Sequence, residues 1–208
     1  MKIVKNITLA LVLLSSGLTA AQTITYSFGD PITNSVVPYG SEPWFIIQLN
    51  QMNGYTTVTM NSHLSNGEFI SKVGFNLNTS VDYGSLIFTP SDLIGNFATP
   101  QFSSGNDTFN GGGGNSYDLN IQFTTSNSGG GINRFNLNDS ITFNVNLPIT
   151  AFTNNTNQLA SIVHIQGIGE GGTQSTWLIP NTPQIPETSS LLLGSIGMVL
   201  LLNRKRYA

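Results

Sequence analysis

Two stretches of the chain alternate strictly between apolar and polar residues, and this period of two constrains the fold more than any other feature. In residues 118–123 every second side chain from Leu119 is apolar, and in residues 141–147 every second side chain from Ile141 is apolar. Half-buried antiparallel strands have this pattern, because successive side chains point to opposite faces of a sheet. The pattern also predicts the register, since a slip of one residue would bury the polar set.

Less regular runs of the same kind recur along the chain, and turn signals such as Asn53-Gly54 and Gly169 to Gly172 separate them. About nine strands are expected, and no amphipathic helix between residues 22 and 184. The sequence therefore predicts an all-β fold, a single β-sandwich of the jelly-roll or immunoglobulin-like Greek-key form. The expected strands are Ile24–Phe28, Trp44–Leu49, Tyr55–Met60, Phe69–Leu77, Ser85–Thr89, Leu119–Phe123, Ile141–Leu147, Ala160–Ile168 and Thr176–Ile179.

Two connections can be predicted in more detail. Asn53-Gly54 lies between two strand-like runs and predicts a hairpin with a two-residue type I′ turn. Residues 93–115 are rich in Gly, Asn and Ser, which predicts a long irregular connection. Gly111 to Gly114 within it is neither followed by Lys nor placed between a strand and a helix, which favours a flexible loop over a phosphate-binding one.

The first 21 residues have the three parts of a secretory signal peptide. Lys2 and Lys5 supply the positive region, residues 7–14 an apolar core, and Thr19-Ala20-Ala21 small residues for cleavage. We expect a signal helix here and a mature protein that begins near Gln22.

Residues 185–208 form a second three-part segment. Pro186, Glu187 and Thr188 precede an apolar run from Leu191 to Leu202, and Arg204, Lys205 and Arg206 follow it. This tail resembles the PEP-CTERM sorting signal of exported bacterial proteins, although Thr188 stands where the family most often has a second proline. The resemblance implies recognition by an exosortase-type enzyme and delivery to the cell surface or the extracellular matrix.

The tail is expected to form a hydrophobic transmembrane helix whose basic end stays on the cytoplasmic side. A permanent span needs about 20 apolar residues, and the run from Leu191 to Leu202 is shorter. We therefore expect a transient anchor in the inner membrane, and a membrane-anchored precursor that is processed later. The alternative is a final buried helix of the domain, which would leave the basic cluster unexplained.

Charge in the intervening domain, residues 22–184, excludes several partners. Only Lys72 and Arg134 are basic there, against nine acidic residues. Such a surface cannot neutralise phosphates, so nucleic acid and anionic lipid are not expected as partners. The charge leaves neutral sugars and divalent cations open as ligands. The chain has no cysteine, which excludes thiolate nucleophiles and sulfur-based zinc sites.

The second half of the chain, from about residue 70 to 208, is similar in layout to PEP-CTERM proteins of unassigned activity. The similarity depends on His164-Ile165-Gln166-Gly167, the glycine-rich turn after it, and Trp177 ahead of the tail. It implies a secreted β-domain associated with exopolysaccharide or biofilm matrix, and it supplies no catalytic residue.

Candidate ligand contacts are the aromatic residues, because a flat ring can stack on a sugar face. Trp44 and Trp177 lead this set, which also includes Tyr55, Tyr83 and Tyr117. Core packing is the alternative for each ring. His164 is a further candidate contact, although a histidine hydrogen-bonded within the fold is the more natural interpretation of its place in a strand-like run.

Calcium is the metal that the composition favours, and Asp107, Asp118 and Asp139 are its candidate ligands, since Ca²⁺ takes hard oxygen ligands. The alternative is that these residues form turns by bonding their own backbone. No catalytic motif is present. A noncatalytic surface or matrix protein is therefore the first hypothesis, and the alternative is a secreted carbohydrate-active hydrolase that uses Glu or Asp, with Glu42, Glu68 and Glu170 as candidates.

Overall fold

The computed structural model describes residues 22–32, 35–65 and 67–181, and these form an all-β domain. The all-β prediction is confirmed, and the helices of the described residues are short 3₁₀ turns only. The ten strands are β1 (Thr23–Pro31), β2 (Phe45–Met52), β3 (Tyr55–Ser62), β4 (Phe69–Phe75), β5 (Phe88–Ile94), β6 (Gln101–Asn110), β7 (Ser116–Gln122), β8 (Ser140–Val145), β9 (Ser161–Ile168) and β10 (Gln174–Pro180).

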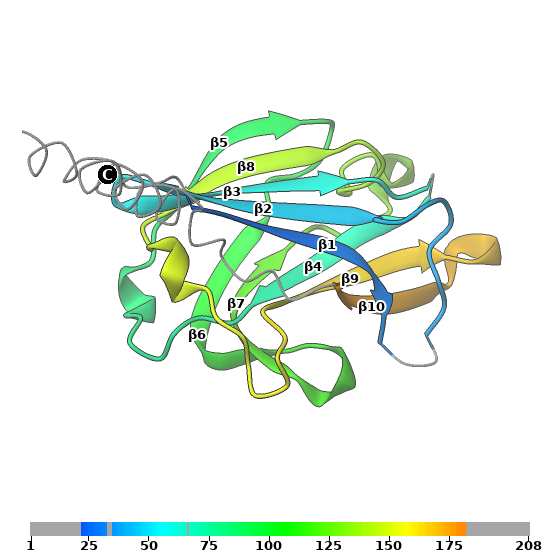
Figure 1. Ribbon diagram of the computed structural model, residues 1–208. Helices are drawn as coiled ribbons and strands as arrows, with labels where there is room; N and C mark the ends of the chain where they lie inside the picture. The colour runs from blue at the N-terminus through cyan, green and yellow to red at the C-terminus, as the bar shows by residue number, and fades with distance from the viewer. Residues whose placement is uncertain (1–21, 33–34, 66, 182–208) are drawn as a thin grey trace, which may run out of the picture. The chain divides into compact units, whose positions relative to one another are not determined.

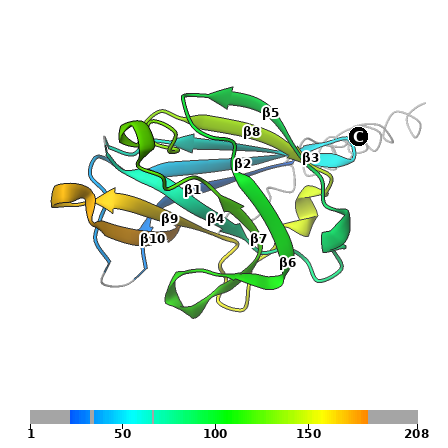
Figure 2. The same ribbon diagram turned by 180° about the vertical axis from the view of Figure 1, so that it is seen from behind.

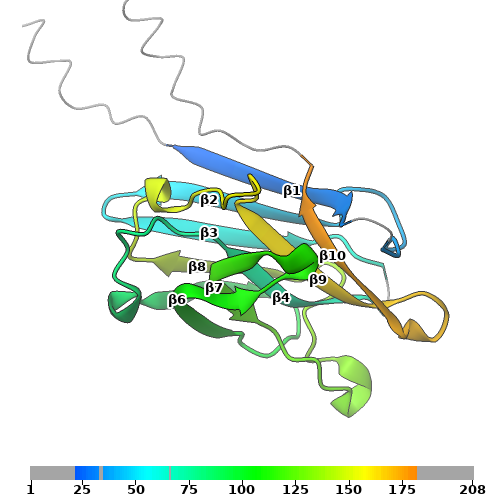
Figure 3. The ribbon, with the colours of Figure 1, turned by 90° about the horizontal axis from the view of Figure 1, so that it is seen from below.

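All ten strands belong to one antiparallel sheet, in the order β5-β8-β3-β2-β1-β10-β9-β4-β7-β6. The sheet bends on itself at the β1–β10 pair, so that β5, β8, β3 and β2 lie opposite β9, β4, β7 and β6 (Figures 1 and 3). Ring contacts join the two halves across the core: Tyr26 on β1 lies 6.4 Å from Phe75 on β4, and Phe102 on β6 lies 5.1 Å from Phe143 on β8.

The core contains the apolar side chains that the alternating sequence pattern predicted to be buried. In β8, Ile141, Phe143 and Val145 are fully buried, and the residues between them are partly exposed. The register prediction for this strand is therefore confirmed. Burial of apolar surface is the main stabilising term in a fold of this kind. Both halves of the sheet supply it, since the core also contains residues of β4, β7 and β9 such as Val73, Ile121 and Ile165.

Side chains rather than hydrogen bonds join the two ends of the sheet. β5 pairs only with β8, and β6 pairs only with β7, so each is an edge strand. The Phe88 ring on β5 nevertheless stacks on the Phe102 ring of β6, with centroids 4.7 Å apart and planes 6° apart. Figure 2 shows these two edge strands from the side where they approach each other.

A second, smaller apolar cluster lies on the opposite face of β9 and β10 from the main core. Ile162 and Trp177 point into it, whereas their neighbours Val163 and Leu178 point into the main core. Phe109 and Tyr117 complete it. Gly112 packs directly on Trp177, since a Cβ atom built on this glycine would lie 2.5 Å from the indole Cγ.

The structure corrects two sequence predictions about connections. Residues 93–115 are not one irregular segment, because they contain the end of β5 and all of β6. The β2–β3 hairpin does form, with Met52 paired to Tyr55 around Asn53-Gly54. Its turn is not type I′, because Gly54 has φ +83° while Asn53 has no positive φ.

The predicted signal segment 1–21 and the whole tail 185–208, with every residue of the sorting motif, lie outside the described residues. Within the described part of the chain, no helix has the length and apolar character needed to cross a membrane.

Candidate functional site

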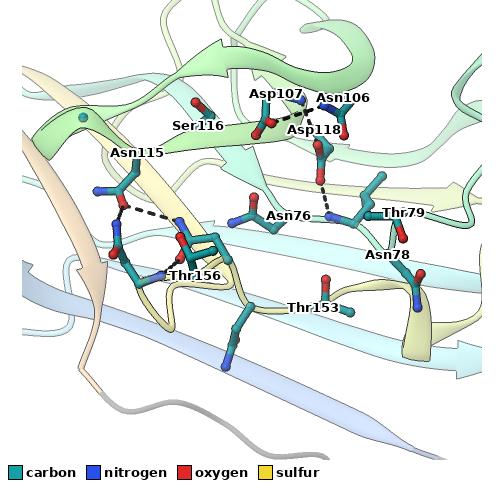
Figure 4. Close-up of a pocket in the computed structure, with 15 residues that line it drawn as sticks. Asn76, Asn78, Thr79, Asn106, Asp107, Asn115, Ser116, Asp118, Thr153 and Thr156 are labelled. Atoms are coloured by element: carbon teal, nitrogen blue, oxygen red, sulfur yellow. Dashed lines mark hydrogen bonds between the residues drawn. The ribbon is translucent and has the colours of Figure 1, made fainter.

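A polar hollow lies where four segments meet: the chain just after β4, the distorted end of β6, the start of β7, and the loop before β9. Its volume is about 570 Å³, within the range typical of small-molecule sites. Labelled side chains from all four segments surround it in Figure 4. Seven asparagines line it: Asn76, Asn78, Asn106, Asn115, Asn154, Asn155 and Asn157.

A bulge in β6 brings one wall of the hollow into place. The β6–β7 register shifts between Ser104 and Phe109, and Asp107 within the bulge has φ +50°, a conformation that Asp tolerates better than most residues. The Asp107 N–H thereby donates to Asp118 Oδ1 at 2.9 Å. Bulges often re-aim side chains in this way beside functional sites.

Asp118 holds two further segments together. It is buried, and its Oδ2 accepts a hydrogen bond from the Leu77 N–H at 2.8 Å. The carboxylate therefore satisfies one backbone N–H from β6 and one from the chain after β4. Buried charge of this kind is tolerated when it is fully hydrogen-bonded.

Asn115 and Asn155 fix the opposite wall, the loop of residues 153–159. Asn155 Oδ1 accepts hydrogen bonds from the N–H groups of Asn157 and Leu159, both at 2.9 Å. Asn115 Oδ1 accepts from Asn157 Nδ2 at 2.6 Å, and Asn115 Nδ2 donates to the Gly112 carbonyl at 3.0 Å. The loop is thus tied both to itself and to the glycine segment before β7.

The side chains that line the hollow are either acidic or uncharged. Its lining residues include two carboxylates, Asp107 and Asp118, and no Lys, Arg or His. Nearby Tyr83 has its pKa raised, first by burial and then by the two carboxylates, so its hydroxyl stays protonated at neutral pH. The walls otherwise offer amides and hydroxyls, which both donate and accept hydrogen bonds.

Comparison with known proteins gave no match to a family model, to a curated protein or to a solved structure.

The aromatic candidates do not line this hollow. Trp44 is only 2% exposed and belongs to the main core, so its prediction as a ligand contact is wrong. Tyr117 is fully buried in the smaller cluster. Trp177 stacks on His164 at 4.2 Å and also contacts Phe109. For these rings, packing is the role that the structure shows.

His164 is hydrogen-bonded within the fold. Its Nδ1 lies 2.7 Å from the Ser71 hydroxyl, which also contacts the His164 carbonyl at 3.2 Å. Burial and the nearby Lys72 ammonium lower its pKa to about 4, so the ring is neutral at pH 7. Ser71 is itself only 1% exposed, which leaves this Ser–His pair no open side for a substrate.

The three aspartates predicted to bind calcium do not come together. Asp107 and Asp118 share the hollow, whereas Asp139 accepts from the Asn136 N–H at 2.7 Å, in the turn before β8. Its pKa is raised because it is buried. Within the described residues no three His, Cys, Asp or Glu side chains form a metal-binding group. Asp139 is a turn former, as the alternative interpretation held.

The candidate glutamates also occupy different places. Glu68 is buried, and its two oxygens accept from the Tyr39 N–H at 2.7 Å and the Ser65 N–H at 3.0 Å. Glu170 lies in the turn between β9 and β10, and Glu42 lies beside Gly29 of β1. None of the three lines the large hollow.

Sequence reasoning missed the asparagines. The run Thr153-Asn154-Asn155-Thr156-Asn157 was the one signal available, because it is an unusual density of amides. The other amides are scattered along the chain, and only the fold collects them.

Proposed function

We propose that this protein is an exported, noncatalytic surface or matrix protein that binds a neutral polysaccharide through the asparagine-lined hollow. The proposal keeps the association with exopolysaccharide or biofilm that the sequence resemblance implies. The bound partner is a chain of uncharged sugars.

The lining of the hollow carries this proposal. Sugar hydroxyls both donate and accept hydrogen bonds, and an amide side chain offers one group of each kind. Four exposed asparagines, Asn78, Asn106, Asn154 and Asn157, present such groups with adjacent threonines over one concave surface. The other three, Asn76, Asn115 and Asn155, use their amides to hold its walls. The absence of any basic residue from that surface argues against an anionic ligand, since nothing there would neutralise its charge.

The alternative is a secreted carbohydrate-active hydrolase, which the placement of Asp107 and Asp118 in one hollow favours. Glycosidases use two carboxyl groups, one of which delivers a proton. Asp118 is buried and already accepts a backbone N–H on each oxygen, so it holds the chain in place and is not presented to a substrate. Asp107 would then lack its partner, and for this reason binding is the stronger proposal.

The route of export and the finer fold are part of the same proposal. We infer that an exosortase-type enzyme recognises residues 185–208 and that the protein reaches the surface through the inner membrane. For the fold, we propose a jelly-roll sandwich. The connections β3–β4, β4–β5, β5–β6, β7–β8 and β8–β9 each pass from one half of the sheet to the other, more crossings than the immunoglobulin arrangement has.

Binding of the exported protein to polysaccharides, measured by affinity electrophoresis, tests the proposal. Neutral polysaccharides should retard the protein, and a polyanion such as alginate should not. Asn154→Ala should weaken binding by roughly tenfold or less, as expected for the loss of one hydrogen bond. Asn133→Ala is the matched control, because Asn133 is exposed and lies outside the hollow.

Two results would reject binding as the function. One is the absence of retardation by every neutral polysaccharide. The other is release of reducing sugars that Asp107→Asn abolishes, which would establish the hydrolase instead.

A further inference from the structure

A second hollow of about 250 Å³ adjoins the asparagine-lined one. Both are lined by Asn154 and Asn157, so the loop of residues 153–159 is the wall that they share. At 250 Å³ the second hollow is smaller than a typical site for a whole ligand. Its size suits a substituent of a ligand whose main body lies in the larger hollow.

The wall between the two hollows is already built. Gln158 has φ +63° at the turn of the loop, and its N–H donates to the Asn155 carbonyl at 3.0 Å. Asn76 Nδ2 donates to the Leu159 carbonyl at 2.7 Å and so ties the loop to the chain after β4. These bonds hold the loop in place, so little ordering is left for binding to impose.

The lining of the second hollow is of two kinds. Asn154, Asn157 and Gln158 supply amides, and Leu159, Ile179 and Pro180 supply apolar surface. An acetyl group has the same two parts, since its carbonyl oxygen accepts a hydrogen bond and its methyl group favours apolar contact.

We propose that the second hollow recognises an acetyl group on the polysaccharide, next to the sugar that the larger hollow holds. This inference rests on the proposed function and narrows its ligand to an acetylated neutral polysaccharide.

Two matched pairs of neutral probes test it by calorimetry on the exported protein. One pair is tetra-N-acetylchitotetraose and cellotetraose, which share a backbone linkage and differ in the acetamido groups. The other is O-acetylated glucomannan before and after mild alkaline deacetylation. In at least one pair the acetylated member should bind at least about fivefold more tightly, as expected when a methyl group leaves water.

The outcomes separate this inference from the proposed function. Equal binding within both pairs would overturn the acetyl site and leave polysaccharide binding intact. Failure of all four probes to bind would also overturn the acetyl site, and the absence of retardation by every neutral polysaccharide in electrophoresis would overturn both.

Ile179→Gln makes the second hollow polar at nearly constant side-chain size, and Ile179 is only partly buried. This variant should lose the preference for the acetylated probe while keeping its affinity for the deacetylated one. Ile132→Gln is the matched control, because Ile132 is exposed and outside both hollows. An Ile179→Gln protein that retains the full preference would reject the site.

Discussion

At the scale of single residues, β8 offers the sharpest test of the fold. Phe143 is fully buried and contacts the Phe102 ring of the opposite half of the sheet. Asn144 points to the other face, where its Oδ1 accepts a hydrogen bond from the Thr57 hydroxyl at 2.9 Å. Phe143→Ala should lower the free energy of unfolding by about 3–5 kcal/mol because it leaves a cavity. Asn144→Ala should lower it by less than about 1.5 kcal/mol. Denaturant titration of both variants measures the difference, and equal losses would contradict the observed register.

His164 predicts how stability depends on pH. Its pKa is about 4 in the folded protein, held down by burial and then by Lys72, against 6.5 for an exposed histidine. Between these values the unfolded chain binds more protons than the folded one, so stability should fall as the pH drops from about 6.5 to about 4. Above 6.5 this contribution is constant.

Thermal unfolding across that pH window should show a shallower slope for His164→Gln than for the natural protein. His63→Gln is the control, since that ring is exposed and bonds only the Pro43 carbonyl among the described contacts. If His164→Gln leaves the slope unchanged, another group governs the acid sensitivity.

At the scale of elements, the glycine segment before β7 has a packing role. Gly112 lies so close to Trp177 that a Cβ atom built on it would come within 2.7 Å of three Trp177 side-chain atoms. Gly112→Ala should therefore destabilise the protein by about 1–3 kcal/mol through overpacking and change the near-UV circular dichroism of Trp177. Gly84→Ala is the control, because its Cβ would meet nothing closer than 3.5 Å. Similar effects from the two changes would mean that the loop moves aside freely.

The sequence predicted elements well where burial alternates and poorly where it does not. β7 and β8 have one face in the core, and their periodicity located them. β6 was missed because it is an edge strand whose bulge interrupts the alternation between Ser104 and Phe109, and because most of its residues are exposed. Trp44 was misassigned because ring type alone does not reveal whether a side chain is buried, and this ring lies in the core just before β2. The asparagine-lined hollow could not be predicted, since it depends on four segments that only the folded chain brings together.

At the scale of the whole molecule, the proposed export predicts the ends of the mature chain. Protein recovered from the culture medium should begin near Gln22 and should lack Arg204, Lys205 and Arg206, because signal peptidase and the sorting enzyme remove the two ends. Intact-mass spectrometry measures this directly. The matched experiment is deletion of the producing cell's exosortase gene, which should leave a membrane-bound precursor. Secreted protein that retains the basic terminus would contradict the sorting proposal.

The seam between β5 and β6 has a consequence for local opening. Ring stacking rather than a ladder of hydrogen bonds closes the sheet there. The backbone amides of these edge strands should therefore exchange with deuterium faster than those of β1, β2 and β9, because the latter strands are paired on both sides. β6 also carries Asn106 and Asp107 of the larger hollow, while β5 contributes nothing to it. A ligand in that hollow should therefore slow amide exchange in β6 more than in β5, and the two edges of one sheet would report separately on folding and on binding.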